Sequence, residues 1–75
     1  MRDFDLVVEL FIKGELDIRD FNFCTHNAGN GNFSAYIMGE GAEQCLAYKD
    51  GFSSEQEVID FFKSLGVTRI LRGVG

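Results

Sequence analysis

Cys24, His26 and Cys45 are the residues whose side chains come closest to a chemical site. Zinc prefers thiolate and imidazole ligands and usually takes four of them. The chain offers two cysteines, one histidine and no Cys-x-x-Cys pair, so we expect no metal and no cofactor. On a strand, Cys24 and His26 would share a face, but a nucleophilic thiol also needs a third group to orient the base. We therefore expect that the protein is not an enzyme.

The glycine-rich segment and the carboxylates are the other candidates. Gly29 and Gly31 lack the third glycine of a dinucleotide-binding loop, and no Gly-Lys-Ser/Thr motif follows them. Residues 27–32 are expected to form a flexible hairpin loop, with contact to a partner as the alternative. Paired catalytic carboxylates would need apolar walls that separate their pKa values. Each carboxylate, taken on its own, is interpreted as a solvated surface charge.

Acidic residues are concentrated in the middle of the chain. The net charge is −5, and the stretch from Met38 to Asp60, with six acids and one lysine, carries the same −5. Direct nucleic-acid binding is disfavoured because phosphate contacts need clustered Lys and Arg. A protein partner with a basic surface is favoured, although plain solubility is the alternative. Interfaces favour tyrosine, and the predicted partner-binding residues are Tyr36, Glu40, Glu43, Tyr48, Asp50, Glu55 and Glu57.

Length and composition indicate a single domain over residues 1–75. Apolar residues make up 45% of the chain and include eight phenylalanines, enough for one dense core. No apolar run approaches the roughly 18–20 residues that span a membrane, and we see no secretion leader. The expectation is a reduced, cytoplasmic protein that does not contact membranes. A disulfide between Cys24 and Cys45 stays open as an alternative.

Alternation of apolar residues predicts the first strand over residues 4–13, with Phe4, Leu6, Val8, Leu10 and Ile12 facing inward. A turn at Lys13-Gly14-Glu15 would lead into a second strand through residue 23, with a bulge near Arg19-Asp20. The alternative for residues 15–23 is a short helix. Residues 25–32 are expected to be a loop because they are rich in Asn and Gly.

The sequence of the second half of the chain predicts two strands, one helix and a last strand. The strands are expected over residues 33–38 and 44–49, with a turn at 39–42. Ser53 or Ser54 can cap a helix that ends before Gly66, and residues 67–71 would form the last strand. The order ββββαβ is that of an α+β fold, an antiparallel sheet of about four to five strands with one helix packed on one face.

The segment from Asp50 to Gln56, followed by an apolar helix ending in Phe61-Phe62, resembles small acidic phage proteins, in outline the anti-CRISPR inhibitors. That resemblance implies a small inhibitor that blocks a nucleic-acid-handling protein complex by occupying its basic surface. Gly31-Asn32-Phe33 before an alternating strand is similar to antitoxins of the HicB type. The chain lacks the Pro-Gly-Cys-like turn expected in those antitoxins.

The expected function is therefore a small acidic protein-binding module that acts as an inhibitor. The first alternative is an antitoxin-like protein. The second is a self-assembling module, possible as a homodimer, that associates through a sheet edge or through Val7 and Phe11. The last alternative is a metal site or a reactive thiol formed by Cys and His residues.

Overall fold

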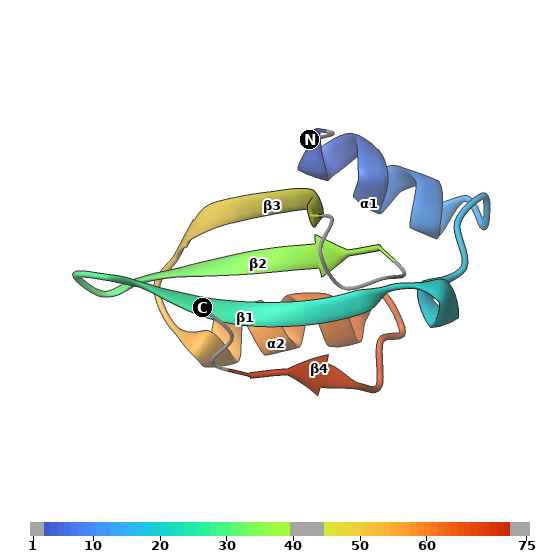
Figure 1. Ribbon diagram of the computed structural model, residues 1–75. Coiled ribbons are helices and arrows are strands. Elements are labelled where there is room, and N and C mark those ends of the chain that lie inside the picture. The colour runs from blue at the N-terminus through green and yellow to red at the C-terminus, as the bar shows by residue number, and fades with distance from the viewer. Residues whose placement is uncertain (1–2, 40–44, 73–75) are drawn as a thin grey trace.

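The computed structural model describes residues 3–39 and 45–72, which form a four-stranded sheet with helices on one face (Figure 1). The elements are α1 (Phe4–Ile12), the 3₁₀ helix η1 (Ile18–Asp20), β1 (Asn22–Gly29), β2 (Asn32–Met38), β3 (Cys45–Phe52), α2 (Glu55–Ser64) and β4 (Ile70–Leu71). The sheet order is β3-β2-β1-β4, with β4 parallel to β1 and the other pairs antiparallel. The α+β class is confirmed. The order ββββαβ, the wholly antiparallel sheet and the single helix were wrong.

The N-terminal segment is a helix, so the strand predicted over residues 4–13 was wrong. The Asp3 carboxylate accepts the backbone N–H of Leu6 at 3.1 Å and caps α1. Phe4, Val7 and Phe11 recur at helical spacing and are buried. In a segment this rich in apolar residues, period-two and helical patterns both find matches. The cap is the local signal that favours the helix.

The chain between α1 and β1 does not form the predicted hairpin. Gly14 has a φ of +80° just after the helix, a conformation that glycine adopts at little cost. The Asp17 side chain then accepts the backbone N–H of Arg19 at 2.9 Å and caps η1. The alternative of a short helix over residues 15–23 is right only for the three residues of η1.

Residues 25–32 are not a loop, because β1 runs through them to a tight hairpin. Gly29 pairs with Asn32, which leaves Asn30 and Gly31 as the turn. Both have positive φ, 54° and 75°, and Asn-Gly is the sequence that two-residue hairpins favour. The strand predicted over residues 33–38 is confirmed as β2.

The last three elements follow the prediction more closely. β3 continues through Asp50-Gly51 to Phe52, whereas the sequence predicted an end at residue 49. The Ser54 hydroxyl accepts the backbone N–H of Glu57 at 3.1 Å, so the predicted cap of α2 is confirmed. β4 is shorter than the predicted strand over residues 67–71. Residues 40–42 of the predicted turn and residue 44 lie outside the described residues.

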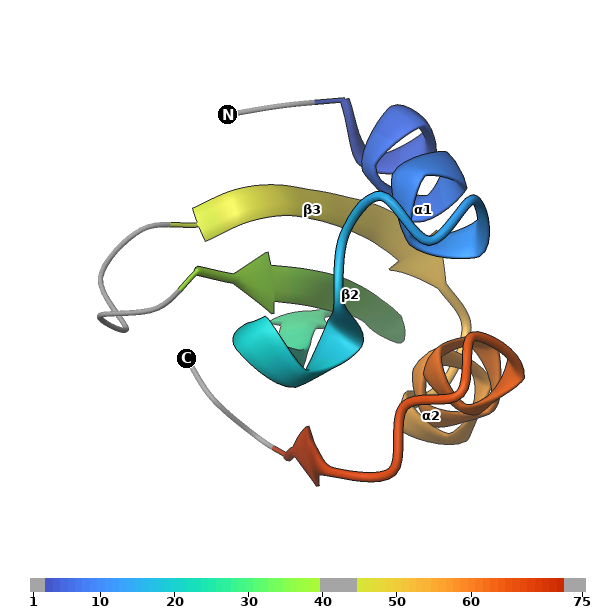
Figure 2. The same cartoon turned by 90° about the vertical axis from the view of Figure 1, so that its right-hand side faces the viewer.

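Both helices lie on one face of the sheet (Figure 2). Aromatic rings join the layers: Phe23 of β1 lies 5.0 Å from Phe62 of α2 and 5.6 Å from Phe11 of α1, between ring centroids. Ile37 and Ala47 complete this side of the sheet and are fully buried. Within residues 3–39 and 45–72, neither helix is long and apolar enough to cross a membrane.

Candidate functional site

The face of the sheet turned away from both helices presents a second set of side chains. Successive residues of a strand point to opposite faces. Phe23, Ile37 and Ala47 point into the core, so their strand neighbours point the other way. We name this surface the open face and define it by eight residues that alternation and pairing place on it: Cys24, His26, Ser34, Tyr36, Met38, Tyr48, Asp50 and Leu71.

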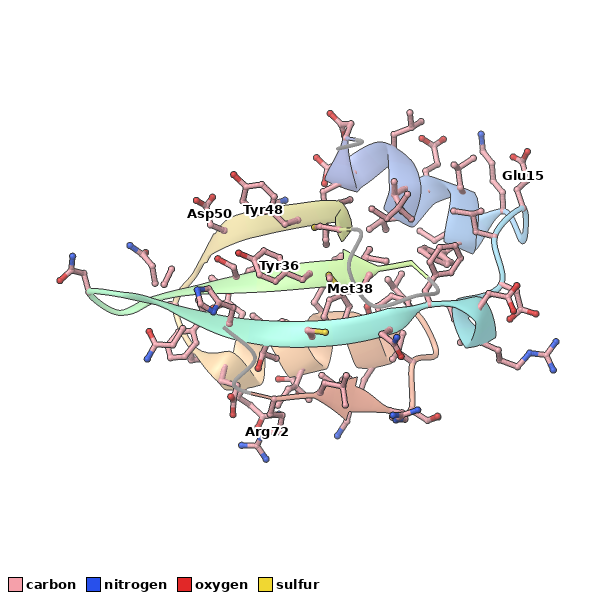
Figure 3. The ribbon with its side chains drawn as sticks, in the orientation of Figure 1. Glu15, Tyr36, Met38, Tyr48, Asp50 and Arg72 are labelled. Carbon is pink, nitrogen blue, oxygen red and sulfur yellow. The ribbon has the colours of Figure 1, made fainter. Side chains whose placement is uncertain are left out.

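Three rings cross the open face from strand to strand. His26 of β1 stacks on Tyr36 of β2 with centroids 5.6 Å apart and planes 14° apart. Tyr36 meets Tyr48 of β3 edge-on, at 5.6 Å and 76°. Tyr36 and Tyr48 are direct register partners, whereas His26 reaches Tyr36 diagonally. We name His26, Tyr36 and Tyr48 the aromatic row, and Figure 3 labels its two tyrosines.

Much of this aromatic and apolar surface is accessible. Tyr48 is 42% exposed and Leu71, beside Cys24, is 36% exposed. His26, Tyr36 and Met38 are half-buried. Tyrosine and methionine are enriched where proteins bind one another, and tyrosine combines a large apolar body with a polar hydroxyl. The open face therefore has the composition of a protein-binding surface.

Cys24 and His26 share the open face, as expected of two residues at i, i+2 on a strand. Cys24 is only 2% exposed. Burial raises the pKa of its thiol, and the neighbouring Cys45 raises it further. The thiolate, not the thiol, is the nucleophile, so this environment works against thiol chemistry. Among the described residues, no group of three His, Cys, Asp or Glu side chains could hold a metal ion. Both cysteines are free.

Glu55 lies away from the aromatic row. Its carboxylate accepts hydrogen bonds from the Arg72 guanidinium, at 2.9 Å from Nε and 2.5 Å from Nη2. The Thr25 hydroxyl donates to the other carboxylate oxygen at 3.3 Å. Thr25 is on the helix-covered side of β1. Arg72 lies at the β4 edge, whereas Tyr48 lies at the β3 edge (Figure 3).

The other acids that were predicted to bind a partner do not lie together either. Glu57 accepts hydrogen bonds from the backbone N–H of Ser53, at 3.3 Å, and from the Ser53 hydroxyl, so it completes the cap of α2. Asp50 is exposed two residues after Tyr48, on the same face of β3 (Figure 3). Glu40 and Glu43 lie outside the described residues. Of the predicted partner-binding residues, the structure thus brings together Tyr36, Tyr48 and Asp50.

Sequence reasoning missed His26 and Leu71 as members of this surface. The alternation over residues 33–38 does place Tyr36 and Met38 on one face. His26 joins them only because β1 extends through the segment expected to be a loop. Leu71 joins because β4 pairs in parallel with β1, and a strand of two residues carries almost no periodic signal.

Comparison of the chain with protein-family models, with curated proteins and with solved structures found no match.

Proposed function

We propose that this protein is a small acidic protein-binding module that contacts its partner through the open face. It acts as an inhibitor by occupying a basic surface of a nucleic-acid-handling protein complex. The observation that carries the proposal is the aromatic row on a sheet face that no described helix covers.

The apolar part of the contact comes from Tyr48, Tyr36, Met38 and Leu71. Exposed apolar surface of this kind marks interaction sites when several residues adjoin. Interface energy concentrates in a few aromatic anchors surrounded by weaker contacts. Tyr48, the most exposed ring of the aromatic row, is the residue best placed to insert into a partner.

Charge supports a basic partner. The chain carries twelve acids against seven bases, and the open face itself carries Asp50. A net charge of −5 attracts a basic surface over distances of about a Debye length, roughly 8 Å at physiological salt. Such attraction speeds encounter and orients the partner. The nucleic acid that normally covers that basic surface would then be excluded.

Affinity capture from host extract at low and high salt tests this proposal, with bound proteins identified by mass spectrometry. We expect a nucleic-acid-handling complex that is retained at low salt and released at high salt. The purified complex should bind either this protein or its nucleic acid, so added nucleic acid should displace the protein in a competition assay. Simultaneous binding of both would contradict the inhibitor mechanism.

Light scattering addresses the alternative occupant of the open face, a second copy of the chain. We expect a monomer across the concentration range. A dimer that Tyr48→Ala converts to monomer would assign the open face to self-assembly and would overturn the proposed partner contact.

A further inference from the structure

A pocket of about 240 Å³ lies where the parallel strands β1 and β4 begin side by side. Residues of η1 and the start of β1 line one side, and residues of β4 and the segment that enters it line the other. Its lining residues are Ile18, Arg19, Phe21, Asn22, Phe23, Val67, Thr68, Arg69 and Leu71. The aromatic row contributes no residue to it.

The lining contains two arginines and no carboxylate, in a chain whose acids outnumber its bases. Arg19 is held by Asp17, which accepts hydrogen bonds from Nε at 3.1 Å and from Nη2 at 2.8 Å. These hydrogen bonds lower the pKa of Asp17 to about 2. Asp17 and Asp20 lie outside the lining, although both act on Arg19 electrostatically. Arg69 forms no ion pair with any residue of the described segments.

The volume of the pocket and its lining residues indicate which kind of ligand it can hold. Pockets for drug-sized ligands begin at about 300 Å³, so this pocket suits something smaller, such as one amino-acid side chain. Ile18, Phe21, Phe23, Val67 and Leu71 form apolar walls, which favour an aliphatic group. A guanidinium favours a carboxylate beside it, through a charge-assisted hydrogen bond.

The neighbouring strand favours a peptide as the carrier of that carboxylate. β4 is the last strand of the sheet on this side, so within the described part of the chain its outer backbone groups have no strand partner. An extended peptide can pair with such an edge while its terminal carboxylate is captured nearby.

We propose that this pocket binds the carboxyl-terminal residue of a peptide that ends in an aliphatic side chain. The side chain fills the apolar walls, and Arg69 binds the terminal carboxylate. The pocket shares Leu71 with the open face but contains no residue of the aromatic row, and its test does not depend on the proposed function.

Titration of the ¹⁵N-labelled protein with acetyl-Ala-Ala-Leu, followed by amide NMR shifts, tests this proposal. We expect shifts at the pocket residues with the free-carboxylate peptide. The same peptide with an amidated terminus should bind about tenfold more weakly, as expected for loss of a charge-assisted hydrogen bond. Arg69→Gln should weaken the free-carboxylate peptide by about tenfold as well.

Lys63→Gln is the matched control, because it removes the same charge from an exposed position outside the lining. It should leave the affinity unchanged. Equal binding of the acid and amide peptides would overturn the proposal, as would equal losses from Arg69→Gln and Lys63→Gln. An absence of shifts at the pocket with millimolar peptide would overturn it too.

Discussion

At the scale of single residues, Cys24 shows how a chemical candidate in the sequence becomes a packing residue in the fold. Its spacing from His26 holds, since both lie on the open face. However, His26 stacks on Tyr36, and Cys24 is almost fully buried with a raised thiol pKa. Burial of an ionisable group favours its neutral form. The burial of Cys24 and the ring contact of His26 therefore favour packing roles over a catalytic dyad.

Alkylation rates check the role of Cys24. At mildly alkaline pH, Cys24 in the Cys45→Ser variant should react with iodoacetamide at least about tenfold more slowly than Cys45 in the Cys24→Ser variant, because burial lowers both thiolate fraction and access. The two thiols should react at similar rates in denaturant. Equal or faster alkylation of native Cys24 would contradict this role and return thiol chemistry to consideration.

At the scale of elements, α1 is where the fold departs most from the prediction. The predicted strand would turn Leu6 inward and Val7 outward. The helix does the reverse, with Val7 fully buried and Leu6 54% exposed. The strand and the helix therefore predict opposite burial for Leu6 and Val7, so substitutions at these two positions test directly which element forms.

Two alanine variants apply that test. Val7→Ala should lower the free energy of unfolding by about 2 kcal/mol, because it removes two buried methyl groups and leaves a cavity. Leu6→Ala should change it by no more than about 0.5 kcal/mol, as is usual for exposed positions. Urea unfolding measures both. A larger loss from Leu6→Ala than from Val7→Ala would support the strand and contradict α1.

The sequence predicts best where one local signal stands alone. Ser54 and Glu57 bracket the start of α2, and no competing pattern crosses them. Residues 4–12 are apolar enough to match both a strand and a helix, so periodicity could not decide between them. The last residues of β1 are polar, so alternation of apolar residues revealed neither this part of the strand nor the position of His26. The Asn-Gly pair that follows β1 was the sequence signal for a hairpin there.

At the scale of the whole molecule, the described acids of the predicted patch do not gather on one surface. Asp5, Glu9, Asp17 and Glu55 each form an ion pair with a lysine or arginine. Exposed pairs of this kind contribute little to stability. They do neutralise charge locally. Of the described acids in the predicted patch, Asp50 lies at the β3 edge, Glu55 pairs with Arg72 at the β4 edge, and Glu57 caps α2. The aromatic row, not the acids, is the feature that unites the open face.

The most direct test of the open face is the dissociation constant of the captured partner for two variants. Tyr48→Ala removes the most exposed ring of the aromatic row, and truncation of an aromatic anchor typically costs 2 kcal/mol or more, about 30-fold in affinity. Ile12→Ala is the control, because Ile12 is 70% exposed on α1, away from the open face. We predict a loss of about 30-fold or more for Tyr48→Ala and no change for Ile12→Ala. Unchanged affinity for Tyr48→Ala, with the fold intact by circular dichroism, would contradict the assignment of the open face as the partner surface.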